Sequence, residues 1–285
     1  MATTKITTPG LFDFSDLNTA LQLPSGNTAS RPSAPSDGEW RFNTEEKYVE
    51  YYDSGTTAWY QIDTEAIEVE VEYLVVAGGG SSGTSSGRTG GGGAGGLLTN
   101  YGSTKISLLA AASINFQVGT GGANPGSFNQ PGNNGQNSYF NASSAGSSDI
   151  TATGGGAGGG GTSTLDSNGR IGGSGGGAGY YGGTTGAAGT PGQGNSGGNG
   201  GTAYAGGGGG GAGGAGANAP SSSNGGAGGI GSVVNILSYT NVGSGGAQVQ
   251  VGEVSGTDVY YAGGGGGGFT GSGGAGGLGG GGTGA

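Results

Sequence analysis

The residue types that most often perform chemistry in proteins are scarce in this sequence. It has no His and no Cys among its 285 residues. This removes His-based general bases, Cys/His zinc sites, haem ligands and disulfides. A Ser–Lys pair would depend on Lys5, Lys47 or Lys105, and none of these lies in a context typical of such a pair. We therefore expect no catalytic residue, no cofactor and a protein that is not an enzyme.

Carboxylates offer two further chemistries. Glu68, Glu70 and Glu72 alternate along a stretch that predicts a strand, so they share one face. They could form part of a calcium site, but a solvated strand face is the commoner outcome because calcium needs oxygens from several segments. We expect no metal site. Paired carboxylates for glycoside cleavage are a remote alternative, and they would come from Asp166, Glu253 and Asp258.

Glycine dominates the composition. There are 82 Gly residues, only 31% hydrophobic residues and 8% charged residues. The runs match the dinucleotide pattern G-x-G-x-x-G by composition alone, and none leads into a helix with an acidic partner. The net charge is -10 and no basic patch occurs, so we expect no nucleic-acid binding. No signal peptide and no stretch of membrane-spanning length is predicted, so we expect a protein made in a cytoplasm without membrane insertion.

The first part of the chain has a mixed composition. Ser15 to Leu21 could form a short helix, and the prolines at 24, 32 and 35 predict an extended connector. Residues 38–62 alternate aromatic and polar positions and predict three short strands with turns between them. We expect Trp40 and Trp59 to form the core of this small sheet, with a sugar-binding platform as the alternative.

The composition changes near residue 77. Residues 65–77 predict one strand that continues into a packed core, and Asn134-Gly135 predicts a hairpin turn. Together with shorter apolar stretches, this predicts an antiparallel β framework. The further candidate strands are residues 106–109, 114–118, 138–140, 150–153, 233–237, 249–254 and 259–261.

Several glycine runs of similar length separate these strands. Collagen is excluded because it requires Gly at every third position with abundant Pro, and only eight Pro occur. A flexible linker remains possible because ordering glycine is entropically unfavourable. A bundle of polyglycine-II helices fits better, since runs without Cβ atoms can approach closely and hydrogen-bond to one another. The runs are residues 90–96, 154–161, 172–179, 206–216, 225–231 and 263–282.

A first resemblance covers about 40 residues of the N-terminal part. It is carried by Leu23-Pro24-Ser25-Gly26, Arg31-Pro32, Gly38, Arg41-Phe42-Asn43-Thr44, Glu50-Tyr51-Tyr52 and Trp59. This pattern resembles a short module near the front of phage tail-fibre and virion proteins, including those of marine cyanophages. The resemblance implies that this part anchors the chain to a particle.

A second resemblance covers about residues 70–285. It is carried by residues 71–80, 116–122, 134–138, 151–156 and 260–263. This part is similar to the glycine-rich domain of phage fibres and adhesins and, more distantly, to that of the anaplastic lymphoma kinase receptor family. The resemblance implies a β framework carrying bundled glycine helices, with tip loops that touch a host receptor. Such domains commonly close with an apolar strand, whereas this sequence stops at Gly281-Gly282-Thr283-Gly284-Ala285, so we expect truncation or a closing strand from elsewhere.

Uncharged polar and aromatic residues between the runs are the candidates for recognition. A nearly uncharged surface of this kind suits neutral sugars or polar protein loops, although each ring could instead serve only to cap or space the bundle. The candidate receptor contacts are Tyr180, Tyr181, Tyr204, Asn218, Asn224, Phe269 and Thr270.

The sequence as a whole predicts a mainly β fold, with a small β module before an antiparallel framework and a polyglycine-II bundle. The expected divisions are residues 1–30, 31–64, 65–153 and 154–285. The expected function is a phage fibre or adhesin in the virion, a homotrimer bound to other virion proteins and to a host receptor such as a glycan. The alternatives are a capsid-surface decoration fibre and a stand-alone glycine-helix protein such as an ice-binding protein.

Overall fold

The chain forms two compact units. In the computed structural model these are Met1–Ala66 and Ile67–Ala285. The structure describes residues 23–62, 67–110, 112–161, 166–180, 184–202, 204–220, 224–237 and 252–285. The short helix expected at 15–21 lies outside these residues. No helix among them is long and apolar enough to span a bilayer.

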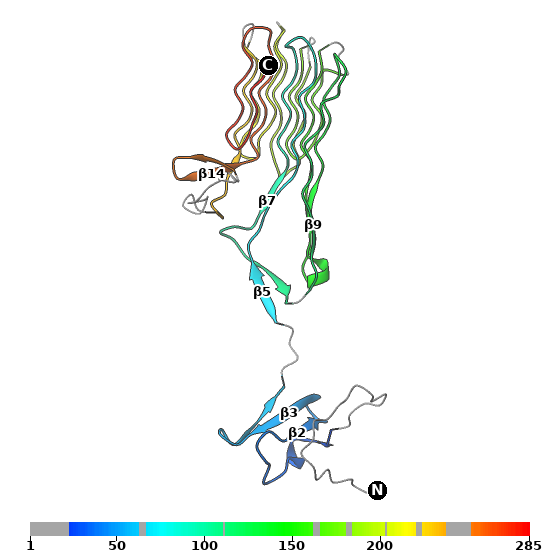
Figure 1. Ribbon diagram of the computed structural model, residues 1–285, viewed down its shortest axis with the longest axis vertical. Helices are drawn as coiled ribbons and strands as arrows, with labels where there is room; N and C mark the ends of the chain where they lie inside the picture. Colours follow the sequence, from blue (N-terminus) through cyan, green and yellow to red (C-terminus); the bar gives the residue numbers. More distant parts are fainter. Residues whose placement is uncertain are drawn as a thin grey trace. The chain divides into compact units, whose positions relative to one another are not determined.

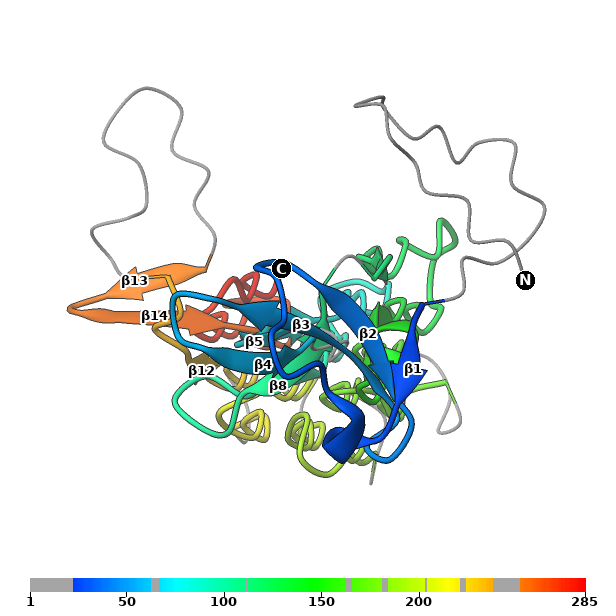
Figure 2. The same cartoon turned by 90° about the horizontal axis from the view of Figure 1, so that it is seen from below.

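The first unit contains a four-stranded sheet in the order β1-β2-β3-β4 (Figure 2). The short β1 runs parallel to β2, and β2, β3 and β4 form an antiparallel meander. Positive φ angles at Lys47 and Thr57 close the two hairpin turns. A single 3-10 turn, η1 at Thr28–Ser30, follows β1. The strands are β1 Ser25–Gly26, β2 Trp40–Asn43, β3 Tyr48–Asp53 and β4 Ala58–Gln61.

The buried residues of this module are polar. Arg41, Asn43 and Glu50 are each less than 5% exposed. Glu50 accepts hydrogen bonds from both Arg31, at 2.5 Å, and Arg41, at 2.9 Å. The expected aromatic core is wrong for Trp40, which is 54% exposed. On the sheltered face Arg41 and Glu50 are paired, which offsets the cost of burying each charge, and the Trp40 ring lies on the other face of the sheet.

Acidification should destabilise this module. Burial by itself would raise the pKa of Glu50, but hydrogen bonds from Arg31 and Asn43 and the charges of Arg31 and Arg41 outweigh it, so the pKa lies below its usual value. A lowered pKa in the folded state stabilises the fold above the unfolded pKa of about 4.3, and this contribution is lost as the pH falls through the lowered pKa.

Denaturant titrations from neutral pH down to about pH 3 should therefore show a falling free energy of unfolding for the module. The variant Glu50→Gln should show a weaker dependence. It would retain the contributions of other groups, such as Asp37, whose pKa is lowered by hydrogen bonds from Ser54. An acid-insensitive module would contradict the role given to Glu50.

The second unit contains a framework of small antiparallel sheets (Figure 1). β5 pairs with β8 and β6 with β7, while β10 lies between β9 and β11 and β14 lies between β12 and β13. A second 3-10 turn, η2 at Ser143–Ala145, lies between β10 and β11. The strands are β5 Glu68–Val71, β6 Leu74–Val76, β7 Leu97–Thr99, β8 Ile106–Leu109, β9 Asn115–Gln117, β10 Ser138–Asn141, β11 Ile150–Ala152, β12 Ser232–Val233, β13 Glu253–Ser255 and β14 Asp258–Tyr261.

Residues 65–77 do not form the single strand that their alternation predicts. The ladder breaks between β5 and β6, where the side chain of Asn100 accepts a hydrogen bond from the Tyr73 N–H at 2.7 Å and donates to the Val71 carbonyl at 3.2 Å. A side chain from a later segment thus replaces the strand partner. Asn134-Gly135 is also not a hairpin turn, because Gly135 donates to Gly155 within a glycine run.

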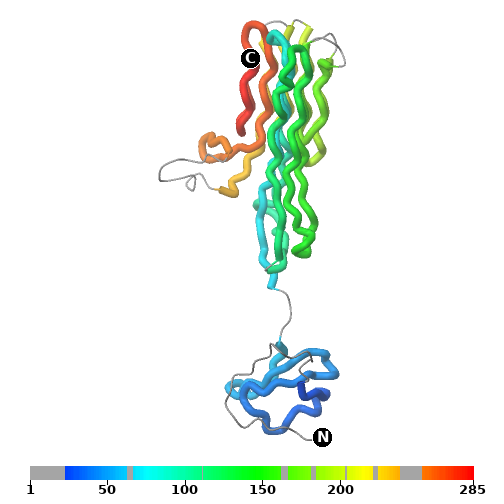
Figure 3. Tube along the Cα trace, turned by 45° about the vertical axis from the view of Figure 1, so that its right-hand side comes forward, coloured from blue at the N-terminus to red at the C-terminus, as the bar shows by residue number. Residues whose placement is uncertain are grey.

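The glycine runs form a polyglycine-II bundle, seen lengthwise in Figures 1 and 3. The run at residues 206–211 shows the pattern. The backbone N–H groups of Gly206 and Gly209 donate hydrogen bonds to the same neighbouring run. In each case the next residue donates to a second run and the residue after that to a third, all at 2.8–2.9 Å. A repeat of three matches the three residues per turn of this helix. The donor-side neighbours are residues 263–268, 172–179 and 213–219.

The carbonyl groups of the same run complete its surroundings. They accept from three other runs in an identical cycle of three, so this run is hydrogen-bonded to six neighbours. Parallel and antiparallel neighbours both occur, since the bonds point outward around the helix rather than along one sheet plane. The acceptor-side neighbours are residues 91–94, 195–198 and 226–229.

The bundle is continuous across its early and late runs. Gly93 donates to Gly156 and Gly91 to Gly207, so the boundary expected at residue 153 falls within one bundle. In the part of the chain that the structure describes, apolar packing is confined to two small clusters in the framework, one around Val259 and one around Leu108. Backbone hydrogen bonds, rather than a large apolar core, therefore hold the runs together.

Candidate functional site

The connecting loops gather at the end of the bundle away from the framework, where Figure 1 also shows the C-terminus. The Tyr180 N–H donates to the Arg88 carbonyl at 2.9 Å, and Ala205 forms a bridge with Phe269. Gly268 donates to Thr89. Loops that are far apart in sequence thus form one surface, which we call the bundle tip.

Two tyrosines and an arginine make contact at the tip. The rings of Tyr180 and Tyr204 lie with their centroids 4.6 Å apart, and the Arg88 guanidinium lies 4.1 Å from the Tyr204 ring centroid. Tyr204 is 47% exposed and has φ 64°, a conformation unusual for a residue with a side chain. The Nε atom of Arg88 is buried and has no hydrogen-bond partner among the described residues.

The second part of the tip is formed by Phe269 and Thr270. Phe269 is half-buried and Thr270 is exposed. The Phe269 N–H donates to the Ala285 carbonyl at 3.2 Å. Both residues crowd Gly87, where an added Cβ would lie 2.9 Å from backbone atoms of each. The chain therefore needs glycine at this position to bring the two loops together.

The predicted asparagines flank this surface. Asn218 and Asn224 are both exposed. Asn218 accepts a hydrogen bond from the Asn199 N–H at 2.8 Å, and Asn224 pairs with Ser272. Tyr181 lies outside the described residues. The structure brings together Tyr180, Tyr204, Phe269 and Thr270, while the asparagines lie in adjoining segments.

The tip combines ring faces, hydroxyl and amide groups and one guanidinium. Exposed tyrosine rings stack against apolar faces of a ligand, and Arg supplies several fixed donors. This arrangement suits a neutral polar ligand or a protein loop. Arg88 was missed by the sequence analysis, because a single basic residue in a Ser/Gly-rich stretch has no local feature that predicts contact with a tyrosine more than a hundred positions later.

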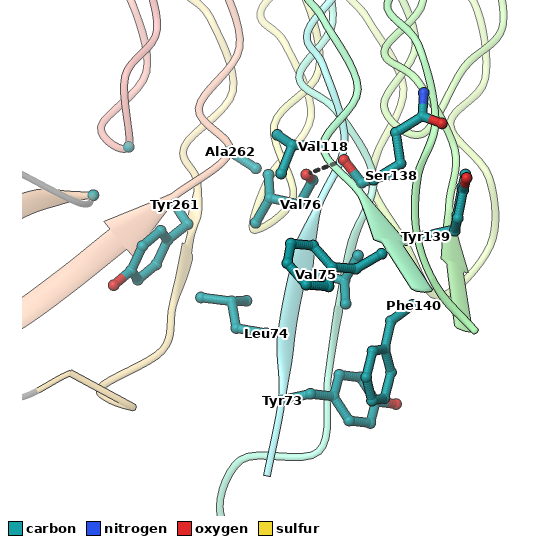
Figure 4. Close-up of a pocket in the computed structure, with 14 residues that line it drawn as sticks. Tyr73, Leu74, Val75, Val76, Val118, Ser138, Tyr139, Phe140, Tyr261 and Ala262 are labelled. Atoms are coloured by element: carbon teal, nitrogen blue, oxygen red, sulfur yellow. Dashed lines mark hydrogen bonds between the residues drawn. The ribbon is translucent and has the colours of Figure 1, made fainter. Parts of the chain in front are cut away.

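An apolar pocket of about 570 Å³ lies at the framework (Figure 4). Phe116 and Val118 are 76% and 78% exposed beside it. Burial raises the pKa of Tyr261, whose hydroxyl has no hydrogen-bond partner among the described residues. The pocket has no acid–base pair, so it resembles an uncovered packing surface more than a site for chemistry. Its other lining residues include Tyr73, Leu74, Val75, Val76, Tyr139 and Phe140.

Several of the carboxylates considered for metal binding or catalysis have other partners. Glu68 accepts from the Ser107 hydroxyl, and Glu253 accepts from the N–H groups of Gly279 and Gly280. Asp258 accepts from Asn235 at 3.3 Å. Among the described residues no group of three or more potential ligands could hold a metal ion. These side chains cap backbone groups and pair strands.

Comparison with known proteins gives one match. The family model described as a glycine-rich domain matches residues 53–285. The searches of curated proteins and of solved structures each returned no match. Because the matched residues make up most of the chain, the protein belongs to the glycine-rich domain family.

Proposed function

We propose that the protein is a non-enzymatic structural component of a phage particle, a fibre or adhesin whose bundle tip contacts the host. The observation that carries the proposal is the gathering of one exposed ring, Tyr204, two half-buried rings and several polar groups at one end of the bundle. Proteins often place the residues that bind a partner in loops, which a rigid scaffold holds in position. The resemblance of the N-terminal module to virion proteins supports attachment through that module.

The bundle tip would contact a host receptor of neutral, polar chemistry, such as a glycan or a protein loop. The N-terminal module would bind other virion proteins, at the tail or at the capsid surface. Purified particles should contain the chain, and antibodies against residues 1–64 should label the tail in images if it is a tail fibre. Labelling of the head would favour a capsid decoration fibre, and recovery of the chain only from lysate would rule out the proposal.

A tip variant should separate host binding from folding. We expect Tyr204→Gly to lower binding of the purified protein to host cells by about tenfold, the loss typical of one aromatic contact. Glycine is chosen because φ is positive at this position, so the backbone should keep its conformation. Tyr101→Gly is the control, since Tyr101 is 42% exposed in a framework turn. Equal binding by both variants would place the receptor contact elsewhere.

A stand-alone ice-binding protein is the alternative from another class. Its activity would need a flat, regular surface, whereas the tip presents mixed rings and loops. A thermal-hysteresis assay distinguishes the two, because measurable hysteresis is expected only for the ice-binding protein.

A further inference from the structure

The N-terminal sheet exposes an aromatic face. Trp40 pairs with Tyr51, and Tyr51 pairs with Tyr60, so one ring from each of three neighbouring strands lies on this side. Their exposed fractions are 54%, 36% and 40%. The rings of Tyr51 and Tyr60 are stacked with centroids 5.8 Å apart. By the same register, Phe42 and Val49 share this face.

The opposite face buries polar side chains instead of an apolar core. It contains the Arg41–Glu50 ion pair and Asn43. All the buried hydrophobic residues found in the structure, from Ala77 to Tyr261, lie in the second unit. Tyr52 and Trp59 also lie on the face of the ion pair, half-buried with ring centroids 5.5 Å apart. The other apolar side chains of the three strands lie on the exposed aromatic face.

A unit of this size needs another source of stability. The first unit spans Met1–Ala66, and domains below about 70–80 residues often add disulfides, a metal or oligomerisation to a small core. The sequence has no Cys, and the described residues contain no cluster able to hold a metal. Oligomerisation is the remaining device, and the aromatic face is the surface available for it.

We propose that this aromatic face, formed by Trp40, Phe42, Val49, Tyr51 and Tyr60, packs against the same face of other copies of this chain. A bound sugar would leave the module without a core, whereas a second copy supplies one. Among the described residues of these strands the face carries one charge, so there is little charge to repel a second copy. This charge is that of Asp53, at the end of β3, whose carboxylate accepts hydrogen bonds from Gly55 and Thr56 in the adjoining turn. The proposal does not depend on the function proposed above.

Single cysteines test the contact directly, since the natural chain has none. Tyr60→Cys places a thiol on the aromatic face, and Gln61→Cys places one on the opposite face of the same strand; both residues are exposed. Under mild oxidation the full-length Tyr60→Cys protein should form covalent dimers, and Gln61→Cys should not. Dimers from both variants, or from neither, would overturn the proposal.

Sedimentation provides the second measurement. The wild-type chain should sediment as an oligomer at micromolar concentration, and Trp40→Ser should shift it towards the monomer while the glycine-rich unit keeps its protease resistance. A monomeric wild type, as expected if the chain covers this face with its own N-terminal residues, would overturn the proposal. So would an oligomer unaffected by Trp40→Ser. If that variant fails to fold, the cysteine pair decides.

Discussion

Gly209→Val should unfold the glycine bundle. A Cβ atom at this position would lie 2.0 Å from the Gly92 carbonyl oxygen and 2.4 Å from its carbon, far inside contact distance. The clash is with backbone, so no side chain can turn away to relieve it. Moving run 206–211 aside would break bonds to several of its neighbours at once, and we expect a loss of at least ~3 kcal/mol in the free energy of unfolding.

Thermal melting with limited proteolysis around residue 209 measures this effect. Neighbouring glycines in another run provide a matched control. Gly80→Ala would place its Cβ 2.2 Å from the Gly156 oxygen, whereas at Gly79 the nearest atom is 3.6 Å away. Gly79→Ala should therefore melt within a few degrees of the wild type, and Gly80→Ala well below it. Equal melting of these two variants, or an unchanged Gly209→Val, would favour a flexible linker over the bundle.

Glu50→Gln should strongly destabilise the N-terminal module. The substitution keeps the side-chain shape but removes the charge that compensates Arg41, whose side chain is 5% exposed. Leaving a buried charge unpaired destabilises proteins by ~3–5 kcal/mol. Arg31 can turn to solvent, since it is 28% exposed, so the lower end of that range applies. Even this loss is large for a module with so little apolar burial.

Tryptophan fluorescence isolates this measurement, because both tryptophans of the chain, Trp40 and Trp59, lie in the module. A denaturant titration followed by this signal should show a lower midpoint for Glu50→Gln. Glu46→Gln, at an exposed turn position, should match the wild type. A Glu50→Gln midpoint equal to that of Glu46→Gln would mean that the ion pair does not stabilise the sheet.

The sequence predicted the fold class well because glycine content constrains the backbone so strongly. Runs without Cβ atoms exclude an ordinary core, and the apolar segments between them predict the strands that anchor the runs. The sequence could not predict which runs are neighbours. Gly93 bonds to Gly156 and Gly209 to Gly265, yet glycines carry no side chain by which such partners could be recognised.

Other differences between the prediction and the structure involve contacts between residues that are far apart in the sequence. Asn100 interrupts the strand expected at residues 65–77, and no local feature of that segment predicts the interruption. In the module, alternation correctly separated Trp40 from Arg41, but the prediction of a buried Trp40 was wrong, whereas Trp59 is half-buried on the face of Arg41. The tip was partly predictable, since residues between runs must lie at bundle ends, whereas the contact of Arg88 with Tyr204 depends on the folded arrangement.

The hydrogen-bonded bundle also has a thermal consequence. Exposure of apolar surface raises the heat capacity on unfolding, and exposure of polar surface lowers it. Unfolding the runs exposes mostly peptide groups, so the heat-capacity change per residue falls below the usual ~12–15 cal/mol/K. A small heat-capacity change makes the curve of the free energy of unfolding against temperature flatter. The bundle should therefore keep gaining stability on cooling, where proteins built on apolar cores pass a maximum at about 10–20 °C and weaken.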